Sequence, residues 1–283
     1  MDHSVLHSVE QAFGMKVMES QRVFGGDINS SAILMLEDTC RYFIKWNRLA
    51  PQHMFETEFK GLKLLKDADH ELHIPEPIKW DPHWLVMDLL EEGRYSPAAA
   101  EHFGRELAAL HKNNATHFGL NHHNFIGRLP QSNEAYEQWA DFYLQERILP
   151  LAYQLHKKGS IHSDQISRFE SLHPIIESLY PDEAPALLHG DLWSGNYFYL
   201  SDGKAAIFDP AVYYGHREMD LAMSRLFGGF APEFYRAYDE VYPLADGFDD
   251  RLKLSQLYPV LVHACLFGGH YIQGSLTILN HYV

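Results

Sequence analysis

The sequence has little cysteine, few basic residues and no long apolar run. Only Cys40 and Cys265 among the 283 residues are cysteines, and two distant thiols argue against a disulfide framework and a structural zinc site. Lysine and arginine number 23 against 38 aspartates and glutamates, which gives a net charge of −15. This net charge opposes binding to nucleic acid or to an anionic membrane, since either would need a basic face.

No apolar stretch is long enough to span a bilayer, and the first residues do not show the basic region and apolar core of a signal peptide. We therefore expect a cytoplasmic protein with a neutral or cationic substrate. The 19 histidines do not fall into groups with zinc-site spacing. With 46% hydrophobic and 22% charged residues, the chain has the composition of an ordinary globular enzyme.

Residues 189–196 read His-Gly-Asp-Leu-Trp-Ser-Gly-Asn and place a carboxylate and an amide at the spacing of a kinase catalytic loop. Asp209 follows 18 residues after Asp191, at the end of an apolar run, near the position of the metal-binding Asp-Phe-Gly element of protein kinases. Phosphoryl transfer needs a group that orients the attacking hydroxyl and takes its proton, and oxygen ligands for magnesium. We predict Asp191 as the catalytic base and Asn196 and Asp209 as magnesium ligands.

The first ninety residues alternate short β-like segments with one helix. Segments 15–23, 32–36 and 41–46 carry apolar or β-branched residues between turn signals, which predicts a small antiparallel sheet. Gly25 and Gly26 lie between the first two segments. Paired glycines let backbone N–H groups approach phosphate oxygens, although an ordinary hairpin has the same signature.

Lys45 lies in the third segment, and the helical spacing of residues 52–66 places Glu58 on the helix that follows. In kinases a helix glutamate holds the strand lysine that contacts the phosphates. This order of elements favours a nucleotide-binding pair over two unrelated surface residues. Asp88, Leu89 and Leu90 end a further buried strand, and we expect them to form a hinge whose backbone binds adenine.

Beyond residue 90 the pattern becomes mainly helical. Helices are predicted at 98–111, 134–149, 162–179, 219–227 and 252–271. The fold class is therefore α+β, a protein-kinase-like fold of two lobes. Residues 1–90 form the small mixed lobe that binds nucleotide phosphates, and residues 91–283 form the larger lobe with the catalytic loop, metal ligands and substrate site.

With these motifs placed, the sequence resembles the fructosamine kinase or ketosamine-3-kinase family, within the kinase-like fold shared with aminoglycoside and choline kinases. Seven segments carry the resemblance over nearly the whole chain: Gly-Gly-Asp-Ile-Asn at 25–29, Phe-Glu-Thr-Glu-Phe-Lys-Gly-Leu at 55–62, and the segments at 104–111, 124–127, 187–196, 209–223 and 226–230. The combination of Asp-Leu-Trp-Ser-Gly-Asn with Tyr-Tyr-Gly-His-Arg-Glu is narrower than the catalytic loop alone.

The resemblance implies ATP-dependent phosphorylation, with magnesium, of the 3-hydroxyl of a ketosamine, the adduct that forms when a sugar glycates an amine. The 3-phosphate makes the adduct unstable and releases the amine. The same resemblance assigns Asp191 as base, Asn196 and Asp209 as metal ligands, and Lys45 with Glu58 as the phosphate-binding pair. An aspartate of ordinary pKa is a poor base for an alcohol, so orientation would be its main contribution.

Five further positions are candidates. Trp193 offers an aromatic face to the sugar or its amine, or packs beneath the loop. His216 and Arg217 contact substrate or cap the next helix. Asp220, together with His189, supports the catalytic-loop backbone by hydrogen bonds.

Asp27 departs from the cysteine that some members of the family carry in the glycine turn, and its carboxylate would repel phosphates unless it faces away or faces magnesium.

Two other functions compete: a kinase for an amino sugar or amino alcohol, and a pseudokinase that only binds nucleotide. The intact Asp191, Asn196, Asp209 and Lys45 argue against the second. The sequence leaves open the preferred sugar, whether whole proteins are substrates, and the oligomeric state.

Overall fold

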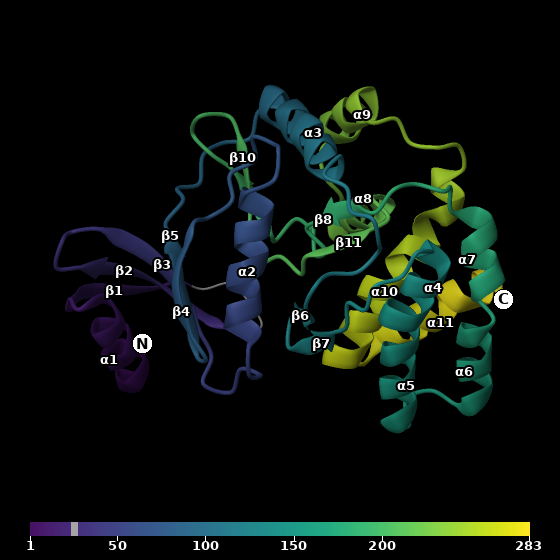
Figure 1. Ribbon diagram of the computed structural model, residues 1–283, viewed down its shortest axis with the longest axis horizontal. Coiled ribbons are helices and arrows are strands. Elements are labelled where there is room, and N and C mark those ends of the chain that lie inside the picture. The colour runs from purple at the N-terminus through teal and green to yellow at the C-terminus, as the bar shows by residue number, and fades with distance from the viewer. Residues whose placement is uncertain (24–27) are drawn as a thin grey trace.

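A five-stranded antiparallel sheet forms the N-terminal part of the structure, a computed structural model that describes residues 1–23 and 28–283 (Figure 1). The strands are β1 (Val17–Val23), β2 (Ser30–Leu36), β3 (Arg41–Trp46), β4 (Pro77–Asp81) and β5 (Trp84–Asp88), in the order β1-β2-β3-β5-β4. Four of them lie within or close to predicted segments. The sequence analysis missed β4, whose polar and aromatic residues follow a proline-rich stop signal.

One helix covers each face of this sheet. The helices are α1 (His3–Phe13), which was not predicted, and α2 (Met54–Lys66). In Figure 1, α1 lies on the outer side of the sheet, and α2 lies between the sheet and the helical part. Successive strand residues point to opposite faces, so Trp84 and Val86 pack towards α1 while Leu85 and Met87 pack towards α2.

The larger part is mainly helical. Its helices are α3 (Pro97–His111), α4 (Trp139–Phe142), α5 (Leu149–Lys157), α6 (Ser163–Glu170), α7 (His173–Leu179), α8 (Glu218–Arg225), α9 (Pro232–Val241), α10 (Phe248–Phe267) and α11 (His270–Tyr282). A π-helix, Tyr143–Ile148, joins α4 to α5. Three short antiparallel pairs complete it: β6 (Asn124–Ile126) with β7 (Leu129–Gln131), β8 (Ala186–Leu188) with β11 (Tyr213–Gly215), and β9 (Tyr197–Tyr199) with β10 (Ala205–Ile207).

Two predicted helices are interrupted. The segment 162–179 forms α6 and α7, with a break at Ser171 and Leu172. The segment 252–271 spans the end of α10 and the start of α11, which Gly268 and Gly269 separate. Both glycines have positive φ, +67° and +60°, a conformation that ends a helix and that glycine adopts at little cost.

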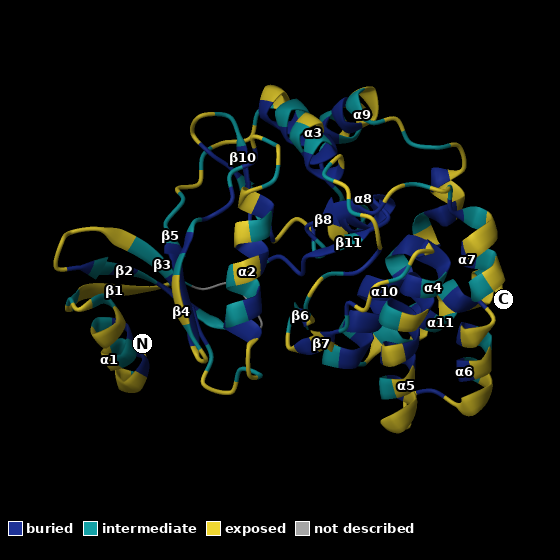
Figure 2. Ribbon diagram, viewed as in Figure 1, coloured by how far each residue is buried: buried dark blue, intermediate teal, exposed yellow. Residues whose placement is uncertain are grey.

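The hydrophobic core crosses the boundary between the two parts. Residues Phe55 and Leu62 of α2 belong to the same buried cluster as Leu107 of α3 and Leu187 of β8. Figure 2 shows β8, β11 and α8 buried at the centre of the larger part. The end of the sheet therefore marks a change of architecture near residue 90, while the packing continues through it.

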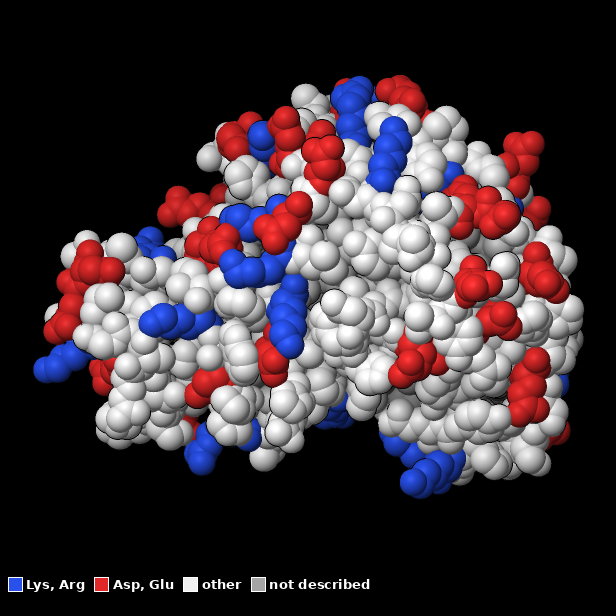
Figure 3. Space-filling model, in the orientation of Figure 1, with Lys and Arg blue, Asp and Glu red and all other residues white. Residues whose placement is uncertain are grey.

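No helix in the described part of the chain is both long and apolar enough to cross a bilayer. On the face shown in Figure 3, lysine and arginine side chains are interspersed with acidic ones.

Candidate active site

A cleft of about 1050 Å³ lies between the N-terminal sheet and the helical part. Nine lining residues had been predicted as site residues: Lys45, Glu58, Asp88, Leu89, Leu90, Asp191, Trp193, Asn196 and Asp209. Gly25, Gly26 and Asp27 lie outside the described residues. The structure thus brings together side chains that are up to 164 positions apart in the sequence.

Lys45 is held between two carboxylates. It pairs with Leu85 across β3 and β5, so its side chain faces α2, where its Nζ donates to Glu58 at 2.5 Å and also to Asp209. Only 7% of the Lys45 side chain is exposed. Burial alone would lower the pKa of Lys45, but the charges and hydrogen bonds of Asp209 and Glu58 outweigh it and raise that pKa. The ammonium therefore stays protonated inside the cleft.

Asp209 has a left-handed backbone, with φ of +59°. Such a conformation is costly for most residues, and aspartate is one of the few that adopt it, because its short polar side chain bonds locally. The ion pair with Lys45 holds the carboxylate in the cleft. Backbone strain of this kind persists only where surrounding contacts enforce it.

Asn196 fastens the catalytic loop that runs from β8 to β9. Its Nδ2 donates to the backbone oxygen of Asp191 at 2.8 Å and to Oδ2 of the Asp191 carboxylate at 3.1 Å. Because the amide nitrogen is directed at Asp191, the amide oxygen is the atom of Asn196 that has ligand capacity. That oxygen and the Asp209 carboxylate are hard donors of the kind that magnesium prefers, so the residues present fit this metal.

Asp220 and His189 hold the backbone of the loop. The Asp220 carboxylate, 1% exposed, accepts hydrogen bonds from the backbone N–H groups of His189 at 2.7 Å and Gly190 at 2.9 Å. The His189 ring donates from Nε2 to the Phe208 carbonyl at 2.9 Å and accepts at Nδ1 from the Asp191 N–H at 3.3 Å. Burial lowers the pKa of His189, which favours the neutral ring that this pattern requires.

The environment of Asp191 departs from the expectation of an ordinary pKa. Burial is the main cause, and together with the charges of Asp209 and Asp220 it raises the pKa of Asp191 to about 7, against the opposing hydrogen bond from Asn196. The base is therefore stronger than an exposed aspartate.

This pKa predicts that the contribution of Asp191 to the stability of the metal-free protein falls as the pH rises. A carboxyl group whose pKa is about 4 when unfolded and about 7 when folded binds more protons in the folded state, so its contribution declines between these values. We expect Asp191→Asn to raise the melting temperature more at pH 8 than at pH 5, in thermal unfolding with a chelator. The exposed control Asp182→Asn should show no such difference, and equal effects of Asp191→Asn at both pH values would contradict the assignment.

Trp193 lies in the cleft and is 36% exposed, which favours the first of its two predicted positions. A Cβ on Gly195 would lie 2.4 Å from the Trp193 ring, so a larger residue at position 195 would displace the ring. The Trp193 ring is nearly perpendicular to that of Phe227, and their centroids are 6.0 Å apart. Phe267 and Tyr271 continue this aromatic lining. The sequence analysis had assigned no role to these last three residues, whose only signal was aromatic character.

His216 and Arg217 lie in the interior at the start of α8, where Arg217 is the N-cap residue and Nδ1 of His216 accepts from the Glu218 N–H at 3.4 Å. The structure therefore favours the second of their two predicted positions, the cap of the next helix. Neither lines the cleft. Arg217 is 2% exposed and donates to both carboxylate oxygens of Glu183, at 2.7 and 2.9 Å. His216 is 1% exposed and packs against the rings of Trp139 and Tyr180. The segment 213–215 is a buried strand, β11, and it directs the residues that follow into the core.

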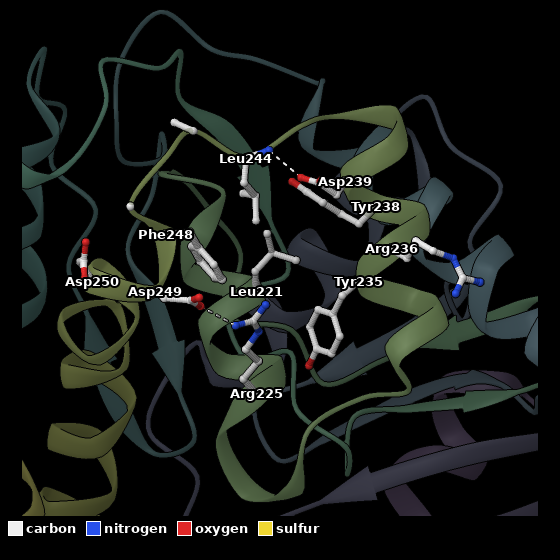
Figure 4. A pocket seen from close by; sticks show the side chains of 12 residues that line it. Leu221, Arg225, Tyr235, Arg236, Tyr238, Asp239, Leu244, Phe248, Asp249 and Asp250 are labelled. Carbon is white, nitrogen blue, oxygen red and sulfur yellow. Dashed lines mark hydrogen bonds and ion pairs between the residues drawn. The ribbon is translucent and has the colours of Figure 1, made fainter.

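A second hollow, of about 600 Å³, lies among α8, α9 and the start of α10 (Figure 4). Arg225 lies over the rings of Tyr235 and Phe248, 4.9 and 4.8 Å from their centroids, and pairs with Asp249 at 3.1 Å. None of the predicted site residues lines it.

Known proteins share this architecture and sequence. A model of the family described as fructosamine kinase matches residues 1–283. A probable ketoamine kinase from Synechocystis is 35% identical over 98% of this chain and 95% of its own length. A protein-ribulosamine 3-kinase from Oryza sativa, described as chloroplastic, is 35% identical over 95% of this chain and 80% of its own.

Solved structures agree. The crystal structure of a putative fructosamine-3-kinase from Thermobifida fusca matches with a TM-score of 0.89 and 34% identity, over 99% of this chain and 98% of the other. An aminoglycoside phosphotransferase with bound ADP matches with a TM-score of 0.64 at 15% identity, over 99% and 97% of the two chains, a likeness of fold alone. The predicted α+β kinase-like fold is confirmed, and the chain belongs to the fructosamine kinase family.

Proposed function

We propose that this protein is an ATP-dependent kinase that phosphorylates the 3-hydroxyl of ketosamines and so promotes deglycation. The observation that carries the proposal is the convergence of Asp191, Asn196, Asp209 and the Lys45–Glu58 pair on one cleft. Membership of the fructosamine kinase family supports it, as do relatives named ketoamine kinase and protein-ribulosamine 3-kinase.

Asp191 orients the acceptor hydroxyl and takes its proton. Asn196 fixes the carboxylate by its hydrogen bond, and a pKa raised to about 7 brings the group close to the value that suits a general base at neutral pH. With this raised pKa, Asp191 takes part in proton transfer, whereas an aspartate of ordinary pKa would mainly orient the hydroxyl.

Lys45 carries the positive charge that contacts the nucleotide phosphates. It stays protonated and is held by Glu58, so its ammonium is already oriented when ATP arrives. Asn196 and Asp209 would hold magnesium, which neutralises charge on the phosphates.

Adenine contacts the segment that follows β5. The Asp88 carboxylate accepts a hydrogen bond from the Glu76 N–H, and the Asp88 N–H donates to the Glu76 carbonyl. Because Asp88 is tied to Glu76 in this way, we assign the adenine hydrogen bonds to the backbone of Leu89 and Leu90, which line the cleft.

The aromatic lining favours an acceptor that carries an amine. Trp193 and Phe227 expose their rings beside the catalytic loop, and aromatic faces attract a cationic secondary amine such as that of a ketosamine. Amino sugars and amino alcohols share this charge, so a kinase for one of them is the second candidate. A cytoplasmic location stays a prediction from the sequence.

A panel of acceptors tests the proposal. Purified protein with magnesium and ATP is expected to release ADP with fructoselysine or ribuloselysine and to give a product phosphorylated at the 3-hydroxyl, identified by NMR. The matched acceptors are choline and an aminoglycoside, which offer a cationic amine and a hydroxyl without the ketosamine. Release of ADP with these two alone would reject deglycation, and the absence of ADP release with every acceptor would favour a pseudokinase.

A further inference from the structure

Arg147, in the π-helix between α4 and α5, is a fully buried cation with an unusual environment. It is 0% exposed, and in residues 1–23 and 28–283 no carboxylate forms an ion pair with it. Three aromatic rings enclose its guanidinium: Tyr213, Phe142 and Tyr258, with centroids 4.0, 4.6 and 5.5 Å from Cζ. Burial of an arginine without a carboxylate is costly, and π-helical turns occur frequently at functional sites.

The hydrogen bonds of Arg147 go to neutral oxygens. Nη1 donates to the Ser132 carbonyl at 2.5 Å and to the Glu146 carbonyl at 3.1 Å, and Nη2 donates to Oδ1 of Asn133 at 2.6 Å. A guanidinium has donors only and keeps its protons at any physiological pH. The amide of Asn133 must therefore present its oxygen to Arg147 and its nitrogen to the opposite side.

This constraint passes along a chain of buried side-chain amides. Nδ2 of Asn133 donates to Oδ1 of Asn124 at 2.9 Å, and Nδ2 of Asn124 then donates to the Val212 carbonyl at 2.8 Å. Asn133 and Asn124 are 1% and 5% exposed. Each amide has one orientation in which donors meet acceptors. Arg147 and the His122 carbonyl, to which Nδ2 of Asn133 also donates at 3.1 Å, fix it for Asn133, and the Val212 carbonyl fixes it for Asn124.

Gln131 makes a parallel link. Nε2 of Gln131 donates to the Ala211 carbonyl at 3.1 Å and to Oδ1 of Asn124 at 2.8 Å, and Oε1 accepts from the Tyr258 hydroxyl at 2.5 Å. Because the carbonyl can only accept, it fixes the direction of the Gln131 amide. Two consecutive backbone carbonyls, those of Ala211 and Val212, are thus held by side-chain amides whose direction is fixed.

These carbonyls belong to the segment that begins at Asp209. The Ala211 N–H donates to the His189 carbonyl at 2.9 Å, and a Cβ on Gly190 would lie 2.1 Å from the Ala211 oxygen. The segment therefore lies directly against the catalytic loop, two residues after the strained backbone of Asp209. Asp209 keeps its left-handed conformation only while its neighbours are fixed.

From this geometry we infer that Arg147 is a positioning residue. Acting through Asn133 and Asn124, with Gln131 as a parallel link, it fixes the segment 209–212 and so sets the place of the Asp209 carboxylate relative to Asp191. The inference rests on the proposed function in assigning Asp209 to magnesium, but the chain of hydrogen bonds is a property of the protein without ligand.

Two variants test the chain. Arg147→Met removes the donors that fix Asn133. Asn133→Asp keeps an acceptor for Arg147, and gains an ion pair with it, but cannot donate to Asn124 or to the His122 carbonyl. We expect this variant to fold, because the new ion pair offsets the lost hydrogen bonds, while the link to Asn124 is cut. Ile148→Ala is the matched control, because Ile148 lies next to Arg147 in the same helix and is fully buried but takes no part in the chain.

The first readout is hydrogen–deuterium exchange of the metal-free protein over residues 209–215. We expect both variants to exchange about tenfold faster there than the native protein, and the control, compared at equal global stability, to match the native rate. Equal protection of this segment in all four proteins would overturn the inference.

The second readout is binding of Mn²⁺ in the presence of a non-hydrolysable ATP analogue, followed by electron paramagnetic resonance. Partners that orient metal ligands typically affect affinity by about ten- to a hundredfold, so both variants should bind Mn²⁺ at least about tenfold more weakly than the control. Arg147→Lys, which keeps donors and charge, should recover part of the loss. If the native protein binds Mn²⁺ and nucleotide but phosphorylates no ketosamine, only the proposed substrate is rejected. If both variants bind Mn²⁺ as tightly as the native protein does, the role of Arg147 is rejected.

Discussion

Replacement of Asp191 by asparagine should lower kcat by about a thousandfold while nucleotide affinity changes by less than about threefold. General-base catalysis contributes on the order of 10² to 10⁴ in rate, and Asp191 faces the acceptor hydroxyl in the proposed complex rather than the nucleotide. Steady-state kinetics with a ketosamine acceptor and calorimetric titration with a non-hydrolysable ATP analogue measure the two quantities separately.

Asparagine is a fair test because it preserves the local structure. The hydrogen bond from Nδ2 of Asn196 to the backbone oxygen of residue 191 does not depend on the side chain at position 191. The side-chain oxygen of an asparagine there can still accept the other hydrogen bond from Asn196. The surface variant Asp182→Asn should retain native kcat. An Asp191→Asn protein with full activity would show that another group takes the proton. A loss of nucleotide affinity with unchanged kcat would show that Asp191 contacts the nucleotide and not the acceptor.

Asp209→Asn should lower kcat/KM for ATP by about a thousandfold at fixed magnesium. It should also raise the half-saturating magnesium concentration at least about tenfold. The reason is the loss of the charged oxygen ligand assigned to the metal, which stabilises developing charge on the phosphates. Asparagine tolerates the left-handed backbone at this position, so the substitution changes charge with little change in conformation. A magnesium series at saturating acceptor measures both effects.

The comparison with Glu58→Gln separates metal binding from the lysine pair. Both substitutions remove one of the two carboxylates that contact Lys45, but only position 209 is assigned to magnesium. An unchanged magnesium requirement in Asp209→Asn, or the same increase in Glu58→Gln, would contradict the assignment of Asp209 as a ligand.

The sequence was informative where a role depends on local spacing. The interval between Asp191 and Asn196 fixes both in one loop, and the alternation of a strand directs Lys45 to the face where Glu58 lies. Asp220 was expected to support the loop, and it accepts two backbone N–H groups there.

Roles that depend on distant contacts were beyond the sequence. His216 and Arg217 lie close to Asp220 in the chain, yet the burial of β11 and the carboxylate of Glu183 draw them inward, and neither influence is visible in a local pattern. The same holds for Arg147, whose proposed effect reaches position 212 through the side chains of Asn133 and Asn124. The π-helix that presents it has no simple periodic signature.

The close contact between α2 and the segment after Asp209 has a consequence for control of the protein. A Cβ on Gly61 would lie 3.0 Å from Val212, and the apolar face of α2 shares one core with α3 and β8. Withdrawal of α2 to separate Glu58 from Lys45 would open that core to water, at a cost that grows with the apolar area exposed. We therefore expect the Glu58–Lys45 pair to stay intact in the protein without ligand.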